Sequence, residues 1–161
     1  MIEISRFQEL SQNKNIILMK LIESEGIVKC LVNNESNFLD IHLPDDFDRT
    51  SLILSKVYPY RFVPTPQMEP QTFITMKFGY RPNGMTFKNG SIYFYIISHN
   101  SLLKTKYDML RYDYLVNKID ELFNSSRDLG IGKLPFYDMD EFVVNENYSG
   151  VYIAYKTTEF Q

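Results

Sequence analysis

Two stretches decide the fold of this chain: TFITMKF at residues 72–78 and SIYFYIIS at residues 91–98. Alternate positions of the first are apolar, which is the period-two pattern of a β-strand, and both faces of the second are apolar or aromatic. Between them lie the turn-forming motifs Pro82-Asn83-Gly84 and Lys88-Asn89-Gly90. We therefore predict a hairpin whose connection, residues 79–90, is a long arm.

A helix and a second hairpin are expected further along the chain. Between Tyr107 and Phe123, apolar residues recur at the three- and four-residue spacing of an amphipathic helix. Residues 134–144 and 151–158 flank the turn Asn145-Glu146-Asn147, and the second of these segments alternates like a strand. These segments predict two more strands, paired with each other.

The N-terminal third is expected to be helical. Residues 15–32 are rich in apolar residues and contain a single glycine, Gly26, which indicates either one helix interrupted near that residue or two short helices. Acidic residues at 45–48 precede an apolar run, which favours a short helix that Pro59 would end. The order of helices, hairpin, helix and hairpin predicts one α+β domain over residues 1–161, with a mostly antiparallel four-stranded sheet.

The proline-rich segment at residues 59–70 contains Pro59, Pro64, Pro66 and Pro70. Proline cannot continue a helix or sit in a central strand, so we predict an extended connector. Its apolar residues indicate that it is held against the body of the domain or against a neighbouring subunit. Residues 59–70 are therefore a second candidate arm.

The chain of 161 residues has 12 Tyr and 12 Phe but no Trp. Tyrosine combines an apolar ring with a hydroxyl group that needs a partner, so it suits half-buried surfaces such as subunit interfaces. An AT-rich genome would enrich the same residues through its codons. Composition alone does not separate these two explanations.

Charge and cysteine content narrow the function classes. The net charge of −3 gives no general attraction to the phosphate backbone of nucleic acid. The single Cys30 cannot form an intrachain disulfide, which is typical of a cytoplasmic protein, and its apolar neighbours favour a buried structural role. No apolar run approaches the roughly 20 residues of a membrane span, so no membrane association is expected.

No set of polar residues has a spacing that catalysis or metal binding requires. Two histidines and one cysteine do not make a zinc site on their own. Asp138, Asp140 and Glu141 lack the spacing of a calcium loop and are expected to form a solvated turn. The glycine-rich residues 129–133 lack the spacing of a phosphate-binding loop and are expected to connect a helix to a strand. We therefore expect no enzyme activity, no cofactor and no metal.

Arg111 lies close in sequence to two acids and three tyrosines. This group could form an ion-pair network between subunits, since interfaces favour Arg and Tyr. Alternatively, Arg111 could pair with Asp108 within one helix, because the two residues are three positions apart. The sequence leaves both interpretations open.

Five blocks resemble small structural proteins encoded among the head and tail genes of tailed bacteriophages. They are Val57–Pro64, Phe87–Gly90, Tyr107–Leu115, Gly130–Leu134 and Tyr148–Tyr155. The predicted order of helix, two strands, helix and two strands is similar to the tail-terminator, or tail-completion, fold. The resemblance covers most of the chain from Val57 onward.

The resemblance implies a ring of identical subunits, typically a hexamer, that caps the head-proximal end of the tail tube. Its implied partners are further copies of itself, the tail tube protein and the head-tail connector or stopper protein, with DNA only as passing cargo in the lumen. Such a protein would assemble in the host bacterial cytoplasm and lie at the head-tail interface of the virion. The alternatives are another neck component, such as a connector or stopper, and a small host-directed inhibitor or enzyme.

Subunit contacts in such a ring are expected on the arms and on the tyrosine-rich helix. The candidate interface residues are Tyr60, Phe62, Met85, Phe87, Tyr107, Arg111, Tyr112 and Tyr114.

Overall fold

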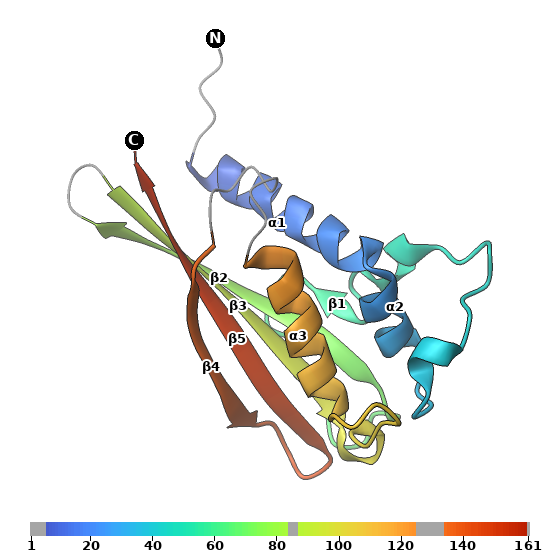
Figure 1. Ribbon diagram of the computed structural model, residues 1–161. Helices are drawn as coiled ribbons and strands as arrows, with labels where there is room; N and C mark the ends of the chain where they lie inside the picture. Colours follow the sequence, from blue (N-terminus) through green and yellow to red (C-terminus); the bar gives the residue numbers. More distant parts are fainter. Residues whose placement is uncertain (1–5, 84–86, 125–133, 161) are drawn as a thin grey trace.

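The computed structural model describes residues 6–83, 87–124 and 134–160. It shows a five-stranded sheet with three α-helices on one face, which confirms the α+β class (Figure 1). The strand order is β1-β2-β3-β5-β4. The strands are β1 (Val57–Tyr58), β2 (Thr72–Asn83), β3 (Phe87–His99), β4 (Phe136–Val143) and β5 (Tyr148–Phe160).

Both predicted hairpins are present. β2 and β3 are antiparallel from the pair Thr72↔Ser98 to the pair Asn83↔Phe87, and β4 and β5 are antiparallel as well. The β2 and β3 strands are longer than predicted, because most of the predicted arm at 79–90 continues their ladder. Residues 84–86 at its tip and the loop at 129–133 lie outside the described residues.

The four-stranded prediction is wrong in strand number, whereas the sheet is mostly antiparallel as predicted. A fifth strand, β1, pairs in parallel with β2 through Val57↔Ile74, so the sheet is mixed. The helix predicted before Pro59 is also absent: the chain forms a four-residue 3-10 helix, Arg49–Leu52, followed by Leu54 at a φ of 67°. A left-handed residue at this point ends the helical turn and leads the backbone into β1.

The helical segments are α1 (Arg6–Glu23), α2 (Glu25–Val32) and α3 (Arg111–Phe123). Ser24 separates α1 from α2, which confirms the two-helix interpretation. α3 begins at Arg111 and not at Tyr107, because Asp108 has a φ of 60° and Leu110 is extended. Among the described residues, no helix is both long and apolar enough to cross a membrane.

The main core lies between the helices and the sheet face that they cover. Strand residues such as Phe94 and Tyr155 point into it. The Phe94 ring stacks on Phe123 of α3 at 5.1 Å between centroids. The Tyr155 hydroxyl donates to Asp120 of α3 at 2.6 Å, which ties β5 to the helix.

The opposite face of the sheet, here called the outer face, carries a second apolar cluster under the 59–70 connector. The Phe62 ring stacks on Tyr58 at 4.3 Å between centroids. The Tyr148 hydroxyl donates to the carbonyl of Glu69 at 2.8 Å, and two asparagine amides of the β4–β5 turn donate to proline carbonyls of the connector. Of the two predicted supports for this segment, the body of its own domain is the one observed.

Gly26 allows α2 to approach α3 closely. A Cβ at this position would meet the Tyr114 hydroxyl, whereas the ring carbon that bears the hydroxyl would be at an ordinary 3.5 Å. We expect Gly26→Ala to destabilise the wild-type chain by about 1 kcal/mol through overpacking. In a Tyr114→Phe background the same change should instead stabilise by up to about 1 kcal/mol, because alanine favours helix. Urea denaturation of the four chains measures this, and equal effects in both backgrounds would contradict the close approach.

Candidate interaction surface

Arg111 lies inside the domain. Its side chain is fully buried, and its Nε and two Nη atoms donate to five backbone carbonyl groups. These carbonyls belong to Leu102, Cys30, Asn33, Asn34 and Glu35. The guanidinium has five N–H groups, so all of them are used. Both sequence interpretations of Arg111 were therefore wrong, because its partners are the carbonyls at the end of α2 and in the loops beside it.

The predicted buried, structural position of Cys30 is confirmed. Its side chain is buried and free, and burial raises the pKa of its thiol to about 12, against the opposing effect of the adjacent Arg111. A thiol that stays protonated is a poor nucleophile and metal ligand.

The three candidate tyrosines of this region are largely packed within the domain. The Tyr107 hydroxyl accepts a hydrogen bond from the backbone N–H of Leu39 at 3.0 Å. Tyr114 is buried and packs edge-on against Phe38, with 5.1 Å between ring centroids. Tyr112 is buried as well, but it lines a groove at the surface.

The candidates on the predicted arms have different surroundings. Tyr60 is 54% exposed, and Phe62 is half-buried against Tyr58. Phe87 pairs with Asn83 and Phe160 in the sheet, but its side chain lies outside the described part of the chain, as does Met85 altogether. Of the eight candidates, Tyr60 is the described side chain most available to a neighbour.

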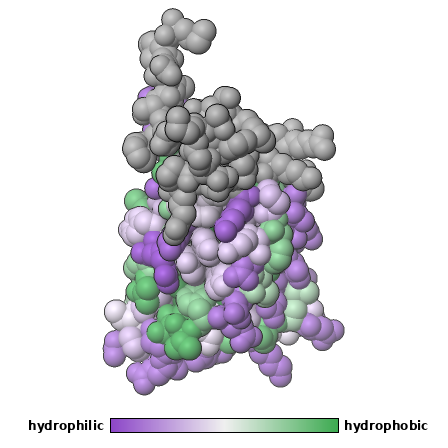
Figure 2. All heavy atoms as spheres, turned by 90° about the vertical axis from the view of Figure 1, so that its left-hand side faces the viewer, coloured by the Kyte–Doolittle hydropathy of each residue, from purple (hydrophilic) through white to green (hydrophobic). Residues whose placement is uncertain are grey.

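Sequence reasoning missed the most exposed apolar strand, β4. This strand ends the sheet, and only β5 pairs with it in the described structure (Figure 1). Four of its eight residues are exposed large apolar side chains: Phe136, Tyr137, Met139 and, at 95% exposure, Val143. Figure 2 faces this side of the molecule and shows hydrophobic patches among hydrophilic atoms.

Two carboxylates cap the free edge of β4. The N–H of Met139 donates to Asp138 Oδ1 at 2.9 Å, and the N–H of Glu141 donates to Asp140 Oδ1 at 2.8 Å. Both N–H groups therefore point away from β5, as alternate residues of an edge strand do. The Tyr152 hydroxyl donates to Asp138 Oδ2 at 2.7 Å, and this bond is the main cause that raises the pKa of Tyr152 to about 12.

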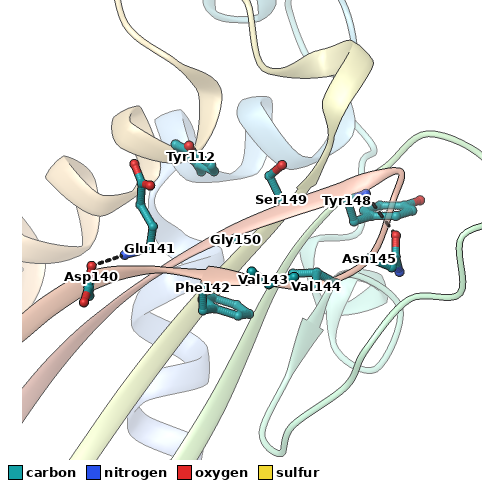
Figure 3. Close-up of a pocket in the computed structure, with 10 residues that line it drawn as sticks. All are labelled: Tyr112, Asp140, Glu141, Phe142, Val143, Val144, Asn145, Tyr148, Ser149 and Gly150. Atoms are coloured by element: carbon teal, nitrogen blue, oxygen red, sulfur yellow. Dashed lines mark hydrogen bonds between the residues drawn. The ribbon is translucent and has the colours of Figure 1, made fainter.

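A groove of about 470 Å³ separates the start of α3 from the β4–β5 hairpin. In Figure 3, Glu141 points toward Tyr112 of α3, whereas Asp140 and Phe142 point to the other side of the strand. Ser149 also lines the groove, and its hydroxyl donates to Asn100 Oδ1 at 2.5 Å. No group of three His, Cys, Asp or Glu side chains suited to a metal occurs in the part of the chain that the structure describes.

The charge of Glu141 influences the pKa of Asp113 on α3. Burial, and secondarily the charge of Glu141, raise the pKa of Asp113 above its usual value. We expect Glu141→Gln to lower the pKa of Asp113, and Asp140→Asn, whose side chain faces the other way, to leave it unchanged. A carboxyl-carbon NMR titration of Asp113 measures both. An equal shift in the two variants would show that the effect is not local to the groove.

The outer face beside β4 is aromatic and of mixed charge. Tyr93, Tyr95 and Tyr152 form a contiguous group, with 5.8 to 6.0 Å between ring centroids. Lys77 lies over the Tyr93 ring and Arg61 over the Tyr95 ring. Asp138 and Asp140 follow on the adjoining strand.

These features define an α+β domain in which, among the described residues, four exposed large apolar side chains lie on one sheet edge. A protein-family model, YomW, matches residues 24–157, and the chain belongs to this family. YomW is a Bacillus phage-region protein, so the family places the chain among phage-associated proteins. No curated protein matches the sequence.

Proposed function

We propose that this phage-associated protein is a tail terminator: a structural virion protein that forms a ring, caps the tail tube and joins it to the head connector. The observation that carries the proposal is the exposed β4 edge. A strand with one unpaired edge and four exposed apolar side chains is an aggregation hazard for a protein that works as a monomer. A ring removes the hazard, because each subunit covers the edge of its neighbour.

The aromatic outer face gives such an assembly further contact area. Tyr and Arg are enriched at interfaces, and here three tyrosines lie beside Arg61. The expected partners are other copies of this chain, the tail tube protein and a connector or stopper protein. The working location is the head-tail interface of the virion, after assembly in the host cytoplasm.

DNA would pass through the lumen of such a ring without specific binding. The net charge of −3 is compatible with that role, because strong attraction to phosphate would slow transit. The proposal assigns no catalytic step to the protein, so its function depends on shape and on subunit contacts.

The direct test is electron microscopy of purified tail tubes of the parent phage mixed with the protein. A tail terminator is expected at one tube end only, and added terminator should stop further tube growth. Tubes with bare ends would contradict the proposal. Antibody labelling of the virion distinguishes the alternatives, because a connector or stopper protein would lie on the head side of the tube end.

A further inference from the structure

The sheet has a second free edge, opposite β4. On β2, β1 pairs with Ile74 and Thr75. Beyond Thr75, residues 76–83 of β2 have no strand on that side in the part of the chain that the structure describes. This segment and β4 are both eight residues long; Pro82 has no N–H, so the donors of this edge lie within residues 76–81.

The two edges carry opposite charge on the same sheet face. On the outer face β4 carries Asp138 and Asp140, and the strand contains no basic residue; Glu141 points to the helix-covered face. On β2, Lys77 is exposed and lies 5.7 Å from the centroid of the Tyr93 ring. The Tyr93 ring packs against Tyr152, and the Tyr152 hydroxyl donates a hydrogen bond to Asp138. Lys77 and Asp138 therefore both lie on the outer face.

The two edges also match on the helix-covered face. Met139 of β4 is 42% exposed and lies opposite Ile153, a core residue, in the ladder. On β2, Phe78 is half-buried and packs against the same core. Joined edges would therefore place apolar side chains together on one face and opposite charges together on the other, which are the cross-strand pairs that stabilise sheets.

We infer that β4 of one subunit pairs with residues 76–83 of β2 in the next subunit, so that one sheet runs continuously around the assembly. This inference rests on the proposed function, because it names the contact that closes the ring. Three antiparallel steps separate β2 from β4 within the sheet, so β4 runs opposite to β2. Rotation about an axis along the strands preserves this relation and makes the joint antiparallel.

The position of β1 limits the register of the joint. Within one sheet, Asp138 lies at the level of Lys77, and Asp140 lies at the level of Thr75. Because β1 occupies the edge beside Thr75, β4 must shift toward Asn83. A shift of about four residues clears β1: Val143 then lies opposite Met76, and Asp140 lies opposite Gly79, diagonal to Lys77 and within reach of a long side chain.

A two-fold contact between two β4 strands fits less well. It would bring the acidic residues of one strand against those of the other, and like charges directly opposite each other destabilise a sheet. The joint between β4 and β2 has no such conflict. It is also head-to-tail, the type of contact that generates a ring.

The two aspartates have a role before and after assembly. In the free subunit their carboxylates occupy the outward N–H groups of Met139 and Glu141. Pairing gives these N–H groups to carbonyl oxygens of β2 and releases the carboxylates toward Lys77. The same residues thus protect the edge of a single subunit and select its partner.

The test is to mix charge-reversed subunits. Asp138→Lys with Asp140→Lys makes β4 basic, and Lys77→Glu makes β2 acidic, so each variant alone has like charges at every joint. We expect each to lose self-association at least tenfold in sedimentation velocity, and an equimolar mixture to form rings of alternating subunits. Asp140→Lys alone is the milder β4 variant if the double change does not fold.

Control variants distinguish failure of the β4–β2 joint from failure of the proposed tail-terminator function. Asp45→Lys with Asp46→Lys, and Lys104→Glu, make the same charge changes at exposed sites away from both edges and should leave assembly unchanged. Normal assembly of Lys77→Glu alone, or failure of the mixture to restore rings, would overturn the β4–β2 joint while wild-type rings still support the proposed function. A wild-type protein that stays monomeric would overturn both.

Discussion

Replacing Arg111 with methionine is expected to lower the free energy of unfolding by at least about 3 kcal/mol. The substitution leaves five carbonyl groups without their donor, and each buried unsatisfied acceptor costs about 1–3 kcal/mol. It also removes the guanidinium from the Phe38 ring, which lies 4.6 Å away. Since domains of this kind have about 5–15 kcal/mol in total, the variant should be marginally stable in urea denaturation.

Arg49 provides a matched control for this prediction. Its Nη1 donates to the carbonyls of Ile22 and Glu23 at the end of α1, but its side chain is only half-buried. Water can replace those bonds, so Arg49→Met should cost about 1 kcal/mol or less. Arg111→Lys keeps the charge but not the planar set of five donors, and an intermediate loss is expected. Equal losses for Arg111→Met and Arg49→Met would refute the role of Arg111 as a buried donor.

The second large effect is expected on assembly, from Met139→Pro. The Met139 N–H faces the free edge and not β5, so proline removes no hydrogen bond of the subunit's own ladder. It does remove a donor from the proposed joint and places a ring where the neighbouring strand must approach. We expect self-association to weaken on the order of hundredfold, equivalent to about 2.7 kcal/mol, by sedimentation velocity.

Two control variants accompany Met139→Pro. Met139→Ala keeps the N–H and loses only the side chain, so its effect on association should be smaller. Asp140→Pro removes an N–H that points the other way. Strand alternation directs the Asp140 N–H toward β5, so its loss should destabilise the subunit itself. Unchanged association of Met139→Pro would show that the β4 edge is not a subunit contact.

The sequence predicts the fold well where a local pattern determines it. Alternation placed the hairpin strands correctly, and the apolar spacing after residue 107 located α3, although its start was four residues early. The two-residue strand β1 could not be predicted, because two residues show no alternation. Val57 and Tyr58 join the sheet through a long-range contact with Ile74 and Thr75. Short parallel pairing of this kind is a tertiary property.

The candidate surface was predicted less well, because exposure depends on strand order. Arg111 looked available for an interface among acids and tyrosines, but its partners are up to 81 residues away in sequence. Phe136, Tyr137 and Met139 looked like ordinary strand residues next to a solvated acidic turn. Only the order β1-β2-β3-β5-β4 shows that they lie on a free edge and that the acids cap it. The aspartates beside them were considered as metal ligands and not as edge residues.

Electron microscopy of the purified wild-type protein tests the central claim most directly. A subunit with a protected but free β4 edge and a complementary β2 edge should form closed rings with a central hole, uniform in size and lost on Met139→Pro. Isolated single subunits at high protein concentration, with the wild type and Met139→Pro indistinguishable, would contradict the account.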